Sequence, residues 1–436
     1  MSNQRSNKLT RRSFIEKSAI GIAGLTLIPS FRGFGANDTI NLGFIGLGRQ
    51  AMFLLNGFMG LDGVKVLAGC DVYGIKRQRF ENRVNEFYKN KGTSVNVKTY
   101  EKYQELLERE DIDAVVIATP DHWHALIAID AVQAGKDVYL EKPLTFTIKE
   151  GQMLVKAVRK HDKILGVGSQ QRSDPNFQHA VKLVQEGKLG DIEKIYAYVG
   201  APPKPYDLPE ETLPQDLNWD LWLGPNPYVH YNHELNPPIS LNPQKNENIW
   251  GAWRWYKEMG GGFTTDWGAH MFDIAQWGIG MDKNGPVEII PAGYGDYQYL
   301  TYKYANGITM TEEPFNKRKT KGVKFVGKNE WIEVSRGYFK ASTKSLEPNL
   351  KKESGPYETK IPHQVNFIEA VRAHKDPQVP VEIGHSTCTV CTLGNISYDL
   401  GSPVKWDPVK QQFLDDKNTE PYMHRKYRNG YKLPVI

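Results

Sequence analysis

Cysteine is scarce in this sequence, with 3 residues among 436. Three cysteines cannot form a disulfide framework, which excludes the small secreted domains that depend on one. Two of them stand one helical turn apart in Cys388-Thr-Val-Cys391. They fall in a predicted helix over 386–400, where residues so spaced are usually both packed in the interior. We therefore expect no metal ion at this pair.

A basic run that could follow a nucleic-acid backbone is also missing after the first 36 residues. The formal net charge is +5, and residues 1–36 account for all of it, with six Lys or Arg and one Glu. Because the remaining chain is formally neutral, we expect no nucleic-acid partner.

The apolar run at 19–29 is too short to cross the roughly 30 Å hydrocarbon core of a bilayer. It follows Arg11-Arg12-Ser13-Phe14, and paired arginines before a short apolar stretch resemble a twin-arginine export signal. That system exports folded proteins with their cofactor inside. We expect residues 1–36 to be this signal and the mature chain to be periplasmic or otherwise exported, with no stable membrane span. A disordered basic tail or an uncleaved anchor is the alternative.

Aromatic residues, by contrast, are plentiful, with 17 Phe, 22 Tyr and 10 Trp. Together with a hydrophobic content of 40%, they allow a substantial core, and the chain length suggests two domains with additional segments. Core packing explains most of these rings, although aromatic rings also stack on sugars.

A glycine-rich turn follows the first apolar run. Residues 40–45 predict a buried parallel strand, which breaks at Gly46-Leu-Gly48, and Ala51 follows. Gly46 allows a tight turn, Gly48 lets the backbone approach a pyrophosphate, and Ala51 lets the next helix pack closely with its N-terminus towards the phosphates. A turn of this kind is weak evidence alone, because such glycines are common in α/β proteins.

Two further strands strengthen this interpretation. The run 64–70 ends in Asp71, 25 residues after Gly46, where a carboxylate can accept hydrogen bonds from the adenosine ribose. The run 114–118 ends in Thr119-Pro120. Arg49 could meet the pyrophosphate or the 2′-phosphate of NADP, but Asp71 would repel that phosphate, which favours NAD. A solvated loop acid is the alternative for Asp71.

Alternating strands and helices from 37 to 168 predict a parallel, doubly wound sheet. Four motifs occur in a fixed order, namely Gly46-x-Gly48, Thr119-Pro120-x-x-x-His124, Ala134-Gly-Lys136 and Glu141-Lys142-Pro143. With them the chain resembles the Gfo/Idh/MocA family of NAD(P)-dependent sugar and cyclitol oxidoreductases. The resemblance implies an α/β chain with a Rossmann domain at 37–168 and a substrate and oligomerisation domain at 169–405. The second domain would be α+β, with a large, mostly antiparallel open sheet, and 406–436 would be a tail.

The resemblance also implies a set of cofactor-binding residues. Thr119, Pro120 and His124 would line the nicotinamide side, although an unliganded helix histidine is the alternative for His124. The full set comprises Gly46, Gly48, Arg49, Gln50, Asp71, Thr119, Pro120, His124, Glu141 and Lys142.

Lys142 follows an apolar strand at the edge where open α/β sheets bind ligands. A lysine withdrawn from water near a cationic nicotinamide can exchange a proton near neutral pH. The resemblance implies contacts with the substrate hydroxyl and the nicotinamide ribose, and a peptide bond before Pro143 that is often cis. A surface lysine beside a turn proline is the alternative.

Asp266 and His270 are four residues apart in a predicted helix and therefore share one face. A carboxylate one turn from an imidazole can hold its tautomer, so that the ring takes a hydroxyl proton at neutral pH. The family uses an Asp-x-x-x-His pair beside the lysine, which makes Asp266, His270 and Lys142 the expected catalytic residues. A helix contact without catalysis is the alternative.

Substrate contacts are expected from two segments. Arg172 follows the last strand of the nucleotide half, where the family places residues near the substrate. The long excursion 201–262 carries Trp253 and Arg254, which could stack on a sugar or grip its oxygens, although a packing arm is an equal alternative. His230 and His233 lie there without a nearby carboxylate pattern, so no metal is expected.

These expectations describe an exported oxidoreductase that moves hydride between tightly bound NAD and a sugar or cyclitol, with NADP the less favoured cofactor. The main alternative is a glycoside hydrolase or lyase on the same fold, which oxidises its substrate transiently. A non-catalytic sugar-binding protein is a third possibility. The outer face of the sheet is often a dimer surface in the family, so a homodimer or homotetramer is expected.

Overall fold

The computed structural model describes residues 39–241, 250–348, 360–414 and 419–436. The expected twin-arginine signal at 1–36 lies outside the described residues. Within them, no helix is both long enough and apolar enough to cross a bilayer.

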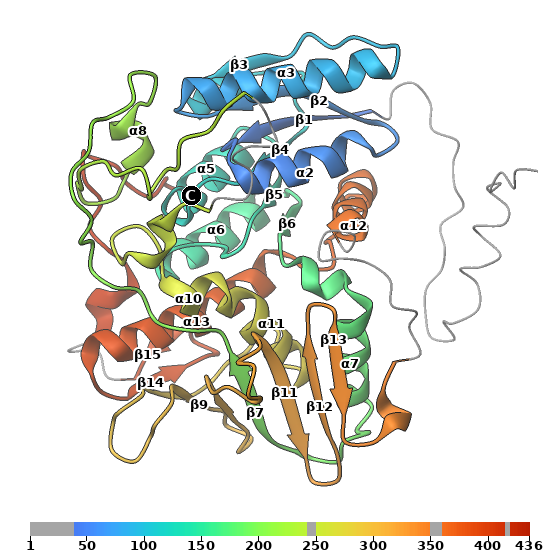
Figure 1. Ribbon diagram of the computed structural model, residues 1–436, viewed down its shortest axis with the longest axis vertical. Coiled ribbons are helices and arrows are strands. Elements are labelled where there is room, and N and C mark those ends of the chain that lie inside the picture. The colour runs from blue at the N-terminus through green and yellow to red at the C-terminus, as the bar shows by residue number, and fades with distance from the viewer. Residues whose placement is uncertain (1–38, 242–249, 349–359, 415–418) are drawn as a thin grey trace, which may run out of the picture. The chain divides into compact units, whose positions relative to one another are not determined.

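The first sheet has six parallel strands in the order β3-β2-β1-β4-β5-β6 (Figure 1). Its central strands are continuous apolar runs, as expected for a sheet covered on both faces. The strands are β1 (Ile40–Ile45), β2 (Val64–Cys70), β3 (Lys98–Tyr100), β4 (Ala114–Ile117), β5 (Asp137–Leu140) and β6 (Leu165–Val167). The predicted doubly wound sheet is confirmed.

Helices cover both faces of this sheet and enclose a separate core on each. One face is covered by α2 (Arg49–Met59) and α3 (Gly74–Asn90), with α12 (Lys360–Ala373) against α2. The other is covered by α4 (Tyr103–Leu107), α5 (Asp121–Gln133) and α6 (Ile148–Lys160), with α13 (Val381–Leu400) against α6. The two late helices therefore return to the nucleotide half.

The second sheet has nine strands in the order β13-β12-β11-β7-β10-β9-β8-β14-β15. Neighbouring strands are antiparallel except β7 and β10, which run parallel. The strands are β7 (Ile192–Tyr198), β8 (Glu288–Ile290), β9 (Thr301–Lys303), β10 (Thr309–Thr311), β11 (Gly322–Gly327), β12 (Trp331–Ser335), β13 (Tyr338–Ala341), β14 (Val404–Asp407) and β15 (Gln412–Phe413). The mostly antiparallel sheet is confirmed.

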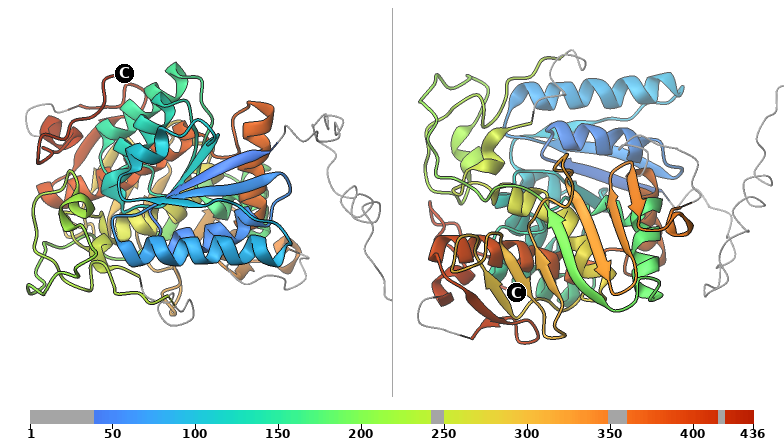
Figure 2. Two further views of the ribbon diagram at one scale, coloured as in Figure 1. Left: turned by 90° about the horizontal axis from the view of Figure 1, so that it is seen from above. Right: turned by 60° about the horizontal axis from the view of Figure 1, so that its bottom comes forward.

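One face of this sheet packs on α7 (Pro175–Gln185), α11 (Gly268–Gly278) and α13 (Figure 2). Ile195 and Ala197 of β7 point into that core, while Tyr196 between them is only half-buried on the opposite face. This alternation is the period of two expected for a strand with one covered face. The predicted boundary at 405/406 falls inside β14, a short strand next to the edge strand β15, because so short a strand carries little sequence signal.

The long excursion between β7 and α10 (Gly262–Asp266) forms an arm with its own small core. It contains α8 (Trp219–Leu223) and the 3-10 turn η2 (Ala252–Trp255). Trp219 and Trp222 stack at 4.5 Å within it, and His122 of α5 contacts the carbonyl oxygens of Trp222 and Met259. The arm therefore packs on the nucleotide half, as the packing-arm alternative requires.

Candidate active site

A cavity of about 960 Å³ opens at the carboxyl ends of the parallel strands. We call it the central cavity. Its wall runs from the Gly46–Gly48 turn through Thr119, Lys142 and the α10–α11 segment to the arm. In open α/β sheets this edge is the usual ligand site, and the volume suits a dinucleotide with a small substrate.

The two glycines of the first turn have different surroundings. Gly46 has a φ of +81°, and an added Cβ would lie 2.7 Å from the Thr119 nitrogen, so only glycine fits. Gly48 has an ordinary φ of −74°, and nothing lies within 4 Å of an added Cβ. The backbone at Gly48 is thus open to the cavity, as close approach of a pyrophosphate requires.

Asp71 lies on the cavity wall at the end of β2. Its carboxylate accepts the backbone N–H of Leu47 at 2.7 Å and that of Tyr73 at 2.9 Å, which fixes it beside the glycine turn. Each oxygen retains further acceptor capacity for ribose hydroxyls. Arg49 also lines the cavity, with its guanidinium 4.2 Å from the Trp250 ring centroid.

Glu141 connects the glycine turn to the lysine loop. Its carboxylate accepts Gln50 Nε2 at 2.6 Å and the backbone N–H of Lys142 at 3.2 Å. The Lys142–Pro143 peptide bond is cis, as the resemblance implies. Gln50 and Glu141, expected as cofactor ligands, line the cavity and also hold each other.

Lys142 pairs with Asp266 across the cavity. Its Nζ donates to Asp266 Oδ1 at 2.8 Å and to the Asp266 carbonyl oxygen at 3.0 Å. Burial opposes ionisation of Asp266, but the charges of Lys142 and Arg254 outweigh it and lower the pKa of this carboxyl. Asp266 is therefore a carboxylate that positions the lysine amine.

His270 also lines the central cavity, so Lys142, Asp266 and His270 all lie on its wall. The prediction that a single helix carries both Asp266 and His270 is wrong. Asp266 ends α10 and His270 lies on α11, so no single helix presents both. Arg336 NH2 donates a hydrogen bond to His270 Nε2 at 3.0 Å. Since a guanidinium only donates, Nε2 is the acceptor nitrogen and Nδ1 carries the proton of the neutral ring.

Asp121 is a buried carboxyl on the cavity wall that the sequence analysis overlooked. Burial raises its pKa to about 7, against the opposing influence of Lys142 and Arg254. Near neutral pH, Asp121 therefore exchanges a proton beside the charged pair. Its position after Pro120, at the start of a helix, could have suggested it.

Trp253 and Arg254 line the cavity from the arm, as expected. The Arg254 guanidinium lies 4.5 Å from the Trp253 ring centroid, and its Nε lies 3.6 Å from Asp266 Oδ1. Trp267 and Phe263 extend this aromatic wall from α10 and its C-terminal end. The wall thus offers ring faces and charged donors next to Lys142, a combination suited to sugar hydroxyls.

His124 is not part of the lining, which corrects its expected place beside the nicotinamide. Its ring is buried between the carbonyl oxygens of Pro143, 2.7 Å from Nδ1, and Thr119, 3.0 Å from Nε2. Burial lowers its pKa to about 4, so the ring is neutral at physiological pH. His124 supports the two loops from behind, while Thr119 and Pro120 face the cavity.

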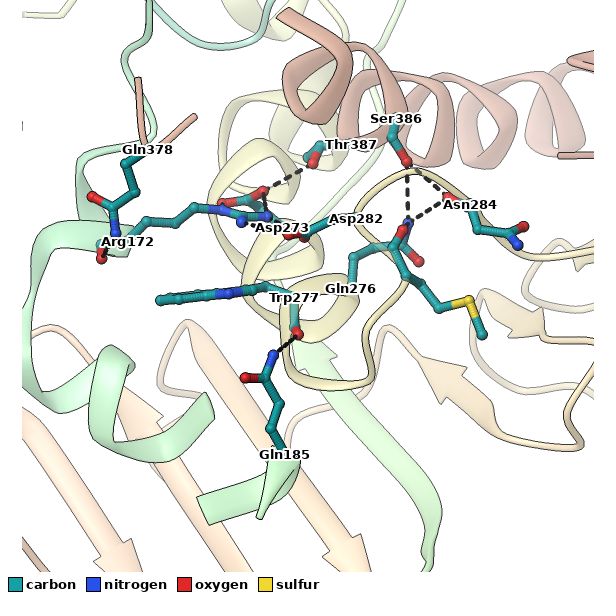
Figure 3. Close-up of polar contacts among 11 residues, drawn as sticks. Arg172, Gln185, Asp273, Gln276, Trp277, Asp282, Asn284, Gln378, Ser386 and Thr387 are labelled. Carbon is teal, nitrogen blue, oxygen red and sulfur yellow. Dashed lines mark hydrogen bonds and ion pairs between the residues drawn. The ribbon is translucent and has the colours of Figure 1, made fainter. Parts of the chain in front are cut away.

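Arg172 is likewise absent from the lining and lies in a buried ion-pair network (Figure 3). Its guanidinium donates to Asp273 at 2.7 and 2.9 Å and to Asp282 at 2.7 and 3.1 Å. The predicted substrate contact is therefore wrong in this geometry, because both carboxylates occupy the guanidinium. Its neighbour Gln170, on the same 3-10 turn η1 (Gln170–Ser173), faces the cavity instead.

Sequence reasoning also overlooked Arg336, which reaches the cavity from the turn between β12 and β13. Nothing local marks it, since a basic residue before a glycine is ordinary in a hairpin turn. Over the described residues, no group of three or more His, Cys, Asp or Glu is arranged to hold a metal ion. Cys388 and Cys391 are both buried free thiols.

The site fits a nicotinamide dinucleotide. A dinucleotide bound across such a sheet meets three features of this cavity. They are the open glycine backbone for the pyrophosphate, the fixed carboxylate after β2 for the ribose and the lysine after β5 for the nicotinamide end. Fold and site together define a dinucleotide-binding α/β protein of two domains.

Comparison with known protein families agrees with a dinucleotide-binding protein of two domains. Residues 40–169 match the profile described as "Oxidoreductase family, NAD-binding Rossmann fold", and residues 196–433 match "Oxidoreductase family, C-terminal alpha/beta domain". The chain belongs to the Gfo/Idh/MocA family of oxidoreductases. Together with the NADH complexes among similar structures, the match supports a nicotinamide cofactor.

Several similar solved structures are sugar or cyclitol enzymes. The myo-inositol 2-dehydrogenase from Lactobacillus plantarum has a TM-score of 0.55 at 18% identity, covering 84% of this chain and 99% of that one. The aldose-aldose oxidoreductase from Caulobacter crescentus has a TM-score of 0.57 at 17% identity, with the same coverages. At such identities the likeness establishes the fold.

Curated relatives carry a different description. A glycosyl hydrolase family 109 protein of Shewanella pealeana is 27% identical over 207 residues, which cover 42% of this chain and 44% of the relative. An alpha-N-acetylgalactosaminidase of Shewanella oneidensis is 29% identical over 157 residues, covering 36% and 34%. The chain thus spans less than half the length of these curated relatives.

Proposed function

We propose that this chain transfers hydride between a tightly held NAD and a hydroxyl-bearing or keto carbon of a sugar or cyclitol. The observation that carries the proposal is that Lys142, Asp266 and His270 lie on the wall of the same cavity as the glycine turn. The sugar and cyclitol dehydrogenases among the similar structures support the substrate class.

Lys142, Asp266 and His270 have different roles in the proposed hydride transfer. Asp266 holds the ammonium of Lys142 at 2.8 Å, so the amine can donate a hydrogen bond to the reacting oxygen. His270 takes the hydroxyl proton at Nε2, after the substrate oxygen replaces the Arg336 N–H there. The displaced guanidinium remains beside the substrate oxygens. When bound, the nicotinamide ring supplies the hydride acceptor or donor.

Lys142→Ala tests this assignment. Loss of the positioned amine should reduce the rate of hydride transfer by about 10²–10⁴-fold, while NADH still binds. The measurement is single-turnover absorbance of NADH with a panel of aldoses and cyclitols. Lys149→Ala, an exposed lysine seven residues on, is the matched control and should retain activity. Unchanged turnover in Lys142→Ala would remove the proposed role of Lys142, whereas an unaltered chain that binds sugars without turnover would favour a sugar-binding protein.

The choice of NAD over NADP rests on Asp71. Its carboxylate, fixed beside the glycine turn at the end of β2, would repel the 2′-phosphate of an adenosine ribose bound there. Titration of tryptophan fluorescence should give tighter binding of NADH than of NADPH, and Asp71→Ser should narrow that difference. Equal affinities in the unaltered chain would contradict this part.

Cleavage of glycosides is the second candidate. The curated relatives named as glycosyl hydrolases favour it, as does Asp121, a carboxyl that can hold a proton near neutral pH beside Lys142. Incubation with aryl glycosides separates the two functions. Release of phenol without net NADH supports cleavage, whereas net NADH formation with a free sugar supports oxidoreduction.

Export through a twin-arginine signal completes the proposal, on the strength of Arg11-Arg12 and the apolar run after them. Little free NAD is present outside the cytoplasm, so the cofactor would be recycled in place, oxidising one sugar while reducing another. Replacement of both arginines by lysine should retain the chain in the cytoplasm. Unaltered export of that variant would contradict this part.

A further inference from the structure

Residues 419–436, to which the sequence assigns no role, reach the central cavity through Tyr431. We call residues 424–435 the strap. Tyr431 is half-buried and lines the same cavity as Asp71 and Lys142. The strap therefore contributes to the ligand site and is more than a surface tail.

Tyr431 completes an aromatic group with Trp123 and Tyr103. The Trp123 ring lies edge-on between them, with centroid distances of 5.5 Å to Tyr431 and 5.8 Å to Tyr103. Trp123 Nε1 donates to the carbonyl oxygens of Leu221 and Trp222, both at 3.1 Å, and the Tyr103 hydroxyl donates to Asp130 at 2.6 Å. Hydrogen bonds thus fix two of the three rings.

The group lies on the adenosine side of the cavity. Tyr103 begins the helix after β3, at the end of the sheet beyond Asp71. A dinucleotide bound across a doubly wound sheet places its adenosine over that half, and its nicotinamide over the half that carries Lys142. The three rings are therefore positioned to contact the adenine, whose flat face is recognised by aromatic side chains.

Contacts on both sides of Tyr431 fasten the strap. Arg428 NH1 donates to Asp220 Oδ1 at 2.6 Å, and the Arg428 backbone N–H donates to the Pro225 carbonyl oxygen at 3.1 Å, so the strap holds the arm. Tyr427 bonds Glu150 of α6, and Gln133 Nε2 of α5 donates to the Val435 carbonyl oxygen at 2.8 Å. The strap thus links the arm to α5 and α6 of the nucleotide domain.

We propose that the strap forms a wall of the adenosine pocket and slows the release of the cofactor. This inference rests on the proposed function only in requiring that NAD(H) binds. Release of the adenosine requires Tyr431 to move, and the bonds of Arg428, Tyr427 and Val435 oppose that movement. A cofactor recycled in place needs such slow release.

The test measures the rate at which bound NADH leaves when excess NAD is mixed in, followed by stopped-flow fluorescence. Tyr431→Ala should accelerate release by about tenfold or more, the equivalent of one lost base–aromatic contact. Arg428→Ala should accelerate it by a smaller factor, because the pair with Asp220 is partly exposed. Lys432→Ala, exposed on the same segment, is the matched control and should release NADH at the native rate.

Turnover at saturating cofactor should stay within about twofold in Lys432→Ala, because this exposed side chain is not part of the cavity lining. Tyr431→Phe keeps the ring and should release NADH at the native rate, and Arg428→Ala tests the strap if Tyr431→Ala unfolds. Native release rates in Tyr431→Ala and Arg428→Ala, with NADH uptake intact, would refute the proposal that the strap slows cofactor release. The proposed function would be unaffected. An unaltered chain that takes up no NADH would overturn both.

Discussion

Gly46 and Gly48 are separated by one residue, yet different requirements fix each of them. Gly46 sits at a positive φ against the backbone of Thr119, which is a requirement of the fold. Gly48 has an allowed φ and open space in front of it, so its lack of a side chain matters only to what occupies the cavity. Replacing each of these two glycines with alanine separates the requirement of the fold from that of the ligand.

Gly46→Ala should lower the free energy of unfolding by at least about 2 kcal/mol, because strain and a backbone clash add. Gly48→Ala should change it by less than about 1 kcal/mol and weaken NADH binding about tenfold or more, as a methyl group obstructs the pyrophosphate. Urea unfolding and fluorescence titration measure the two effects. Unchanged NADH affinity in Gly48→Ala would show that the dinucleotide lies elsewhere.

Asp121 gives the site a pH dependence. Its pKa of about 7 in the fold lies above the ordinary value of 3.8, because burial disfavours the carboxylate. Between these two values the native state binds more protons than the unfolded state, so this group lowers stability as pH rises through that window. The contribution is at most about 4 kcal/mol.

Asp121→Asn should remove this slope, so that the variant gains stability relative to the native chain between pH 5 and pH 8. Thermal unfolding at both pH values measures the difference. Asp399→Asn, an exposed carboxyl, is the control and should follow the native chain. A parallel pH dependence in Asp121→Asn and the native chain would contradict the raised pKa.

At the scale of elements, Arg172 joins four segments behind the cavity. It links η1 to α11 through Asp273, to the following loop through Asp282 and, through Gln378, to the segment before α13 (Figure 3). The Thr387 hydroxyl of α13 also donates to Asp273 at 2.9 Å. Removing one member of such a buried pair leaves an uncompensated charge, whereas removing both ions does not.

Arg172→Met should lower the free energy of unfolding by about 3–5 kcal/mol, and Asp273→Leu added to it should restore much of that loss. Urea unfolding of the single and double variants gives the coupling. Substrate KM should be unaffected in whichever variant folds. A raised KM without loss of stability would return Arg172 to the substrate site.

On the scale of the whole molecule, the nine-stranded sheet presents one face away from its core. Tyr196, Lys324 and Glu333 lie in register across three of its strands, and Lys324 Nζ pairs with Glu333 at 3.1 Å. Glu333 and Tyr196 are buried or half-buried on this face. We propose that it joins copies of the chain into a dimer or tetramer, as the family resemblance implies.

Tyr196→Asp should shift the assembly to monomers, because association would bury an unpaired charge. Light scattering after size-exclusion chromatography measures the mass. Asn82→Asp, an exposed position on α3, adds the same charge away from the sheet and should leave the assembly intact. A native chain that is already monomeric at micromolar concentration would refute the proposed contact.

The sequence by itself determined the doubly wound sheet, the glycine turn and the edge at which Lys142 stands. These follow from local rules, since buried strands are apolar runs and the loops after parallel strands share one edge. The bounds of β1 and β2 match the predicted ranges for that reason. His270 could be proposed because the Asp-x-x-x-His spacing from Asp266 resembles the family motif.

Only the tertiary structure decided which side chains meet. Lys142 and Asp266 are 124 residues apart, Arg172 and Asp273 are 101 apart, and Arg336 is 66 residues from His270. No periodicity encodes such distances. Charged groups pair with whichever opposite charge packing brings within reach, so Asp266 pairs with Lys142 and Arg172 with two buried or partly buried carboxylates.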